Sequence, residues 1–344
     1  MSGTMTIYEI ATLSGCSIST VSRVLNGSPN VNEETRKRVE NTVSKYGFIP
    51  KQNARNFRKQ DLTAVGLMMN DIRNPYMCSL AYTINRELSQ SFVNTILCNI
   101  VDVEKEFISQ LDHLIERKVN GVILMGSIFQ HHVCRVALER KYSGFPFVAI
   151  NGNFGLPNVH EIIQDQVSGT SDAVSYLYSL GRRHIGYIYR HQSASDQKKY
   201  TGFLLGMESC GLRPEFAHEV LNKSLENGME ATRMLLEAYP KTDAILYSAD
   251  VMAVGGVHYM NDHGISIPGD IAVIGFNNST SACECYPPLT SIDNNGELCG
   301  RLAVQMMLRL IHQQPVDDER VSCGLVKRAT TEGKQPDEGG AAHE

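Results

Sequence analysis

The chain has 344 residues, a formal net charge of −5 and a hydrophobic fraction of 42%. This length exceeds one ordinary core and indicates two or three domains. No apolar run approaches the roughly 18 residues that span a bilayer, and the N-terminus lacks the basic and apolar segments of a secretory signal. The nine cysteines are scattered without a C-x-x-C pair, which is typical of reduced thiols. We therefore expect a cytoplasmic protein with no membrane partner.

Charge is divided unevenly along the chain. Residues 1–60 carry nine basic and four acidic side chains, a net charge of +5, which leaves −10 on the remainder. A basic head on an acidic body favours a polyanionic partner for the head and discourages non-specific binding by the body. Basic termini are common, however, so the split alone is not specific.

The first sixty residues predict three short helices and a basic segment. Residues 6–26, TIYEIATLSGCSISTVSRVLN, indicate two helices separated by a turn at Gly15, with the Ser17 hydroxyl as N-cap of the second. Asn32 is the expected N-cap of a third helix. The segment 51–59, KQNARNFRK, is too short for a stable isolated helix. It is either a helix that folds on DNA, with Phe57 as a minor-groove wedge, or a flexible basic linker.

The second helix divides into two faces. Thr20, Val21, Val24 and Leu25 fall on one side, and Ile18, Ser19, Ser22, Arg23 and Asn26 fall on the other. The second set suits a DNA major groove, because a guanidinium bonds guanine bidentately, small polar groups bond base edges, and an aliphatic chain contacts a thymine methyl. A helical hairpin with a solvated outer face explains the same spacing.

From residue 61 the pattern changes to apolar strands alternating with helices, which indicates parallel βαβ units. The two similar series predict two lobes. The expected strands are AVGLMM, NTILCN, GVILMG, FVAIN and EIIQ in one series, HIGYIY, HEVLN, AILYS and IAVIGFN in the other, and LTSIDN and LVKRAT near the end. Helices are expected near Pro75, Glu104, His131, Val167, Asp196, Asn227 and Asp250 and over 296–312.

Ligands of open α/β sheets bind beyond the carboxyl ends of the strands. Amides, carboxylates and aromatic rings gather at those positions and suit a polyhydroxylated ligand. Some of them, Asp250 in particular, are also candidate helix caps. The set comprises Asn70, Asp71, Asn74, Tyr76, Asn151, Asp165, His191, Tyr247 to Asp250, Asn277 and Asn278.

Motifs for catalysis or cofactors are absent from the sequence. There is no G-x-S-x-G elbow, no phosphate-binding P-loop and no H-E-x-x-H. Gly255-Gly256 lies within a helical pattern and indicates close packing. His131, His132 and Cys134 lack a second ligand pair at a recognisable spacing. We expect no enzyme activity, no cofactor and no metal site.

Several motifs together carry a family resemblance. The sequence resembles the lactose-repressor/galactose-repressor (LacI–GalR) family of bacterial transcription regulators over nearly its whole length, to about Thr330. The most specific segment is TIYEIATLSGCSISTVSRVLNGSPNVNEETRKRVENTVSKYGFIP. The core agrees in DIRNPY, KVNGVIL, LGRRHIGYI, MAVGG, IPGDIAVIGF and PPLTSI.

The resemblance implies an α/β protein with a helical head. An all-α helix-turn-helix headpiece (1–50) and a hinge helix (51–60) would precede a two-lobed core like a periplasmic binding protein (61–331). The N-lobe would span about 61–161 and 292–320, the C-lobe about 162–291 and 321–331, and 332–344 would form a disordered tail. A homodimer would bind double-stranded, pseudo-palindromic operator DNA.

The resemblance also assigns DNA contacts. Ile18, Ser19 and Arg23 would read bases, and Phe57 replaces the usual wedging leucine, which leaves the kink geometry open. The remaining members of the set would hold the backbone or bases or belong to the hinge helix: Thr6, Ser17, Ser22, Asn26, Asn30 and Ala54.

The effector pocket departs from the family pattern. Lys199 replaces the usual arginine, Asn277 the usual aspartate, and Ala249 the usual asparagine. Losing a carboxylate while keeping a cation makes the pocket less hostile to anions. We hypothesise an acidic or phosphorylated sugar as effector; alternatively, other residues supply the missing contacts to a neutral sugar. The expected effector-binding residues are Asp71, Tyr76, Asn151, His191, Lys199, Asp250 and Asn277.

The resulting expectation is a repressor of a carbohydrate-utilisation operon, controlled allosterically by an effector between the lobes. A transport-type binding protein is disfavoured by the basic head, the free cysteines and the missing export signal. A sugar-modifying enzyme with a DNA-binding head would need a paired acid and base or a cofactor loop, and the sequence shows neither.

Overall fold

The computed structural model describes residues 6–25, 28, 30–46, 63–214 and 217–332. The chain divides into two compact units, Met1–Thr63 and Ala64–Glu344. The expected hinge helix with Ala54 and Phe57, the side chain of Asn26 and the tail from residue 333 lie outside the described residues.

The first unit contains the three predicted helices, α1 (Ile7–Ser14), α2 (Ile18–Leu25) and α3 (Glu33–Lys45). Their buried faces meet in a small core in which Ile10, Val21 and Val39 are fully buried. The cap predictions for this unit are confirmed: the Ser17 hydroxyl accepts from the Thr20 N–H at 3.2 Å, and the Asn32 side chain accepts from two N–H groups of α3.

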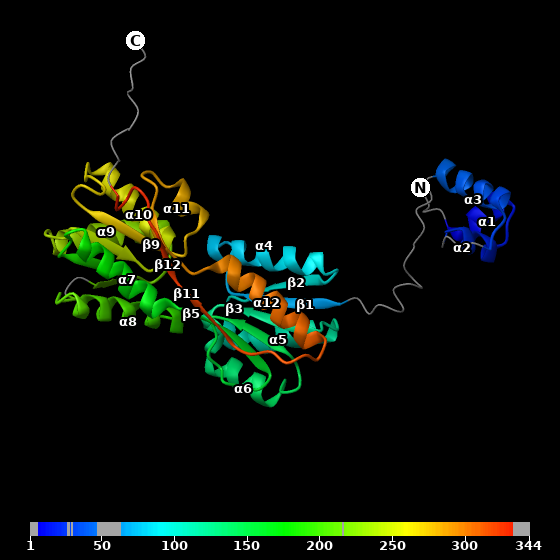
Figure 1. The fold of residues 1–344 in the computed structure, drawn as a ribbon, viewed down its shortest axis with the longest axis horizontal. Coiled ribbons are helices and arrows are strands. Elements are labelled where there is room, and N and C mark those ends of the chain that lie inside the picture. Colours follow the sequence, from blue (N-terminus) through cyan, green and yellow to red (C-terminus); the bar gives the residue numbers. More distant parts are fainter. Residues whose placement is uncertain (1–5, 26–27, 29, 47–62, 215–216, 333–344) are drawn as a thin grey trace, which may run out of the picture. The chain divides into compact units, whose positions relative to one another are not determined.

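The second unit has two lobes, each built on one sheet (Figure 1). Sheet A is entirely parallel, in the order β11-β5-β4-β3-β1-β2. Helices α4 (Pro75–Gln90) and α12 (Gly296–Ile311) pack on one face, and α5 (Val103–Glu116) and α6 (His132–Arg140) on the other. The strands are β1 (Ala64–Met69), β2 (Asn94–Asn99), β3 (Gly121–Met125), β4 (Phe147–Ile150), β5 (Val159–Asp165) and β11 (Glu319–Ser322).

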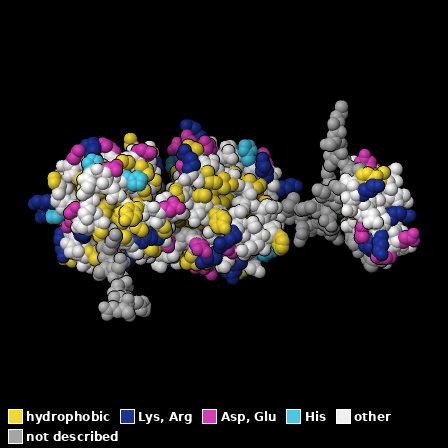
Figure 2. Space-filling model, turned by 90° about the horizontal axis from the view of Figure 1, so that it is seen from above, with side chains coloured by type: hydrophobic (Ala, Val, Ile, Leu, Met, Phe, Trp, Pro, Cys, Tyr) yellow, Lys and Arg dark blue, Asp and Glu magenta, His cyan; other side chains and the backbone are white. Residues whose placement is uncertain are grey.

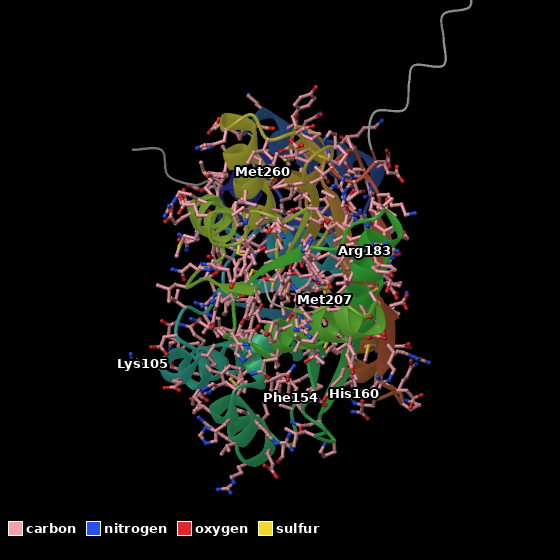
Figure 3. All side chains as sticks on the ribbon, turned by 90° about the vertical axis from the view of Figure 1, so that its left-hand side faces the viewer. Lys105, Phe154, His160, Arg183, Met207 and Met260 are labelled. Atoms are coloured by element: carbon pink, nitrogen blue, oxygen red, sulfur yellow. The ribbon has the colours of Figure 1, made fainter. Side chains whose placement is uncertain are left out.

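Sheet B has the order β12-β10-β9-β8-β6-β7 and is parallel except for β12. Met207 and Met260, both labelled in Figure 3, are fully buried in the two clusters that cover its opposite faces. The strands are β6 (Ile185–Tyr189), β7 (Ala217–Glu219), β8 (Ala244–Tyr247), β9 (Ala272–Phe276), β10 (Thr290–Asp293) and β12 (Gly324–Val326), and the helices are α7 (Gln166–Ser179), α8 (Ala194–Ser209), α9 (Leu225–Ala238), α10 (Asp250–Asp262) and the short α11 (Thr280–Glu284).

The chain passes between the lobes three times: after β5, after β10 and between β11 and β12 (Figure 1). Each passage lies a few residues beyond the expected boundary, because β5 extends to Asp165, β10 to Asp293 and β11 to Ser322. On the face drawn in Figure 2, side chains of both charge signs are scattered over both lobes.

One local prediction needs correction, and some elements were missed. Asp250 is the first residue of α10 and Ala249 takes the N-cap position, so the cap assignment was wrong by one residue. Strand β11 and helix α11 were not predicted, because β11 buries only Val321 and α11 has five residues. Gly255 does serve close packing: a Cβ there would come within 2.1 Å of the Leu225 carbonyl oxygen.

Candidate DNA-reading face and effector cavity

The turn between α1 and α2 is fixed locally. Thr6 and Glu9 form a reciprocal capping box at the start of α1. Gly15 ends the helix with φ of 62°, a left-handed conformation that glycine adopts without a Cβ clash. The Ser17 hydroxyl then starts α2. These caps set where α2 begins and therefore which of its side chains face outward.

The outward face of α2 carries the expected base-reading groups. Ile18 is 44% exposed, although it is a large aliphatic side chain. Ser19 and Arg23 are also exposed, whereas Val21 and Val24 are buried beneath them. Of the other candidate DNA contacts, Thr6, Ser17 and Asn30 are exposed and Ser22 is half-buried. An exposed, mostly polar face on a short helix that is packed on a small apolar core has the form expected of a helix that enters a major groove.

A cavity of about 540 Å³ lies within the second unit and takes residues from both lobes. The lobe built on sheet A is called the first lobe, and the lobe built on sheet B the second lobe. Its polar lining comes mainly from the segments that follow β1, β4, β6, β7 and β9, in agreement with the strand-end rule. The polar lining residues of the first lobe are Asn70, Asp71, Arg73, Asn74, Tyr76, Ser127, Asn151 and Gln164. Those of the second lobe are Gln166, Arg190, Gln192, Ser193, Ser195, Asp196, Lys199, Asn222, Lys223, Ser224, Asn277 and Asn294.

The first-lobe wall is electrically neutral. The Asp71 carboxylate accepts from Arg73 at 2.9 and 3.0 Å, and this pairing lowers the pKa of Asp71. The Tyr76 hydroxyl accepts from Gln164 Nε2 at 3.0 Å. Burial raises the pKa of Tyr76 far above its ordinary value, so its hydroxyl stays protonated.

Asn151 is held firmly in this wall. It is 5% exposed and has φ of 58°. Its N–H donates to the Ile162 carbonyl at 2.7 Å, and its carbonyl accepts from Gln130 Nε2 at 2.8 Å. Its side-chain Oδ1 is buried without a hydrogen-bond partner among the described residues. A buried acceptor without a donor is costly, and a ligand hydroxyl or N–H would satisfy it.

The second-lobe wall contains buried charges. Lys199, 3% exposed, donates to the Ser248 carbonyl at 2.9 Å, and its Nζ lies 3.8 Å from the centre of the Phe276 ring. Burial, together with the neighbouring Lys223, lowers the pKa of Lys199 to about 7. Although burial raises the pKa of Asp196, the charges of Lys223 and Lys199 hold it below its ordinary value. Asp196 forms an ion pair with Lys223.

Known proteins of similar sequence share this architecture. Residues 6–51 match the family model "Bacterial regulatory proteins, lacI family", and residues 174–331 match "Periplasmic binding protein-like domain". An HTH-type transcriptional regulator of Lachnoclostridium phytofermentans is 28% identical over 334 residues, which cover 95% of this chain and 99% of the relative. The chain is a LacI-family transcriptional regulator. Members of this family are regulators rather than enzymes.

Other similar proteins agree with this assignment. Catabolite control protein A of Priestia megaterium is 29% identical over 92% of this chain and 96% of its own length. The lac repressor dimer bound to operator and the anti-inducer ONPF has a TM-score of 0.78 at 23% identity, covering 96% of this chain and 99% of that one. A CelR–cellobiose complex has a TM-score of 0.68 at 24% identity, covering 95% and 99%. These two structures support the fold.

The cavity of this LacI-family regulator brings together five of the seven expected effector contacts: Asp71, Tyr76, Asn151, Lys199 and Asn277. His191 and Asp250 do not line it. His191 is exposed beside the rings of Tyr189 and Tyr200. Asp250 is 1% exposed and accepts from the N–H and hydroxyl of Ser279 and the hydroxyl of Ser291. Its carboxylate holds the loop after β9.

Several polar residues that line the cavity were not among the predicted effector contacts, chiefly Arg190, Lys223, Gln164 and Asn294. Arg190 directly follows β6, so the strand-end rule was sufficient to find it, whereas Gln164 lies inside β5 and gave no such signal.

Among the described residues, no group of three or more His, Cys, Asp and Glu has the arrangement of a metal site. No helix in the described part of the chain is long and apolar enough to cross a membrane.

Proposed function

We propose that this regulator binds a pseudo-palindromic operator as a homodimer and represses genes of carbohydrate utilisation, with an effector in the interlobe cavity setting its operator affinity. The exposed face of α2 on a packed three-helix base carries the DNA-binding half of the proposal. The effector must bind one arrangement of the lobes more tightly than the other, because a ligand with equal affinity for both does not shift the equilibrium between them.

The effector is an acidic or phosphorylated sugar derivative. The cavity is lined by four basic side chains, Arg73, Arg190, Lys199 and Lys223, and by two carboxylates, Asp71 and Asp196. Its amides and hydroxyls suit the hydroxyl groups of a sugar. The excess of cations favours an anionic ligand over a neutral one of the same shape. Preference for a neutral sugar over its matched acid would contradict this part.

Replacement of Arg23 by alanine tests the base-reading role. One bidentate arginine–guanine contact contributes about 1–3 kcal/mol of discrimination, so we expect Arg23→Ala to lower the preference for operator over random DNA by about 5- to 150-fold. The measurement is a pair of titrations of the full-length protein with labelled operator and scrambled duplex at several salt concentrations.

Lys37→Ala is the matched control, because Lys37 is an exposed cation on α3 rather than on the outward face of α2. Removing a phosphate contact weakens binding to all sequences alike and reduces the salt slope. Equal losses of sequence preference in the two variants would contradict the assignment of Arg23 to base reading.

A further inference from the structure

The two walls of the cavity differ in charge. On the first-lobe wall, Asp71 and Arg73 neutralise each other through two hydrogen bonds. The second-lobe wall contributes three cations, Arg190, Lys199 and Lys223, and one carboxylate, Asp196, to the cavity lining. An anionic group entering the cavity is therefore attracted to the second lobe.

Two polar atoms without partners mark opposite walls. Asn151 Oδ1, on the first lobe, is an acceptor, and Arg190 Nε, on the second, is a donor. Both atoms are buried and lack a hydrogen-bond partner among the described residues, and both side chains line the cavity. Native proteins pair most such groups, so an unpaired acceptor and an unpaired donor on side chains that line one cavity make these two residues candidates for ligand contact.

The three cations of the second lobe are not equivalent. The Lys199 ammonium already donates to the Ser248 carbonyl and is covered by the Phe276 ring. Lys223 contacts Asp196 but is more exposed than its partner, and an ammonium has three donors. The guanidinium of Arg190 presents a planar set of donors that matches a carboxylate or phosphate. Arg190 and Lys223 are therefore the direct contacts of the anionic group, and Lys199 contributes its charge without a direct contact.

We propose that the effector binds in one orientation, with its anionic group on Arg190 and Lys223 of the second lobe and a hydroxyl donating to Asn151 Oδ1 of the first. This inference rests on the proposed effector role of the cavity and adds the residues that select the acid. A ligand held in this way has its charged end in one lobe and its hydroxylated end in the other, so it bridges the two lobes.

Calorimetric titration of the full-length protein with matched acids and alcohols tests the inference. The probes are C4–C6 aldonates with the corresponding alditols, and hexose phosphates with the free hexoses. Wild type is expected to prefer an acid over its neutral counterpart by at least tenfold. Arg190→Gln and Lys223→Gln should each lower affinity for that acid about tenfold or more and leave the affinity for the neutral counterpart within about threefold.

Lys198→Gln is the matched control for charge, because Lys198 belongs to the same lobe, in α8, but does not line the cavity. It should leave the acid preference unchanged. Asn151→Gly, which keeps the left-handed backbone accessible, should lower affinity for the acid and its neutral counterpart by the same factor, about tenfold.

Three outcomes would overturn the inference: equal losses for acid and alcohol in Arg190→Gln and Lys223→Gln, a loss in Lys198→Gln as large as in those variants, or wild-type preference for the neutral probe. If no probe binds, both the inference and the effector half of the proposed function fail. If only neutral probes bind and they alter operator affinity, the orientation fails while the regulator function stands.

Discussion

Replacing Ile10 with alanine is expected to lower operator affinity more than a hundredfold and to leave effector binding unchanged. Ile10 is fully buried in a core in which four other apolar residues of the described part of the chain are buried. Emptying such a site costs about 2–5 kcal/mol, and a unit this small has little stability to lose. The loss should follow from an unfolded headpiece, since the effector cavity belongs to the other compact unit.

Leu13→Ala is the control on the same helix, because Leu13 is 48% exposed and its truncation creates no cavity. Fluorescence anisotropy with labelled operator measures the first effect and calorimetric titration of the effector the second. An Ile10→Ala protein that binds operator within threefold of wild type would contradict the assignment of this core as the support of the reading face.

Binding of a carboxylate effector is expected to weaken above neutral pH by up to tenfold per pH unit. The pKa of Lys199 is lowered to about 7 by burial, while Asp196, Lys223, Asp250 and Cys323 also act on it. A bound anion favours the ammonium and raises this pKa. Below pH 7 the amine is already protonated and affinity is flat. Above pH 7 binding takes up a proton, so affinity falls until the pKa of the complex is reached.

The control for this pH dependence is Lys199→Arg, because a guanidinium stays charged throughout the range. Titrations between pH 6 and 9 with an aldonate, whose carboxylate is ionised at all these values, should be steep for wild type and flat for the variant. A wild-type affinity that does not change between pH 7 and 9 would contradict the role of the buried Lys199 charge.

The strands and helices of the core were largely predictable, because their signal is local. Runs such as AVGLMM are apolar at every position and are buried at every position in β1. Strand β11 escaped prediction because ERVS lies at the edge of its sheet and buries a single valine. A polar edge strand is recognisable only from the partner strand that it pairs with.

The candidate cavity was predictable in position but less so in the direction of its side chains. The strand-end rule found Asp71, Asn151 and Asn277, all of which line the cavity. After β6 it suggested His191, whereas the preceding residue, Arg190, lines the cavity. After β8 it suggested Asp250, whose carboxylate accepts hydrogen bonds from the hydroxyls of two serines. Neighbouring residues of an extended segment point to opposite sides, and only the packing of distant segments decides between them.

A linked pair of titrations shows whether the effector cavity controls DNA binding. The preferred acidic effector is expected to change operator affinity about 5- to 150-fold, and operator is expected to change effector affinity by the same factor, because coupling between two sites is reciprocal. An effector that binds the cavity while operator affinity stays the same would contradict this expectation.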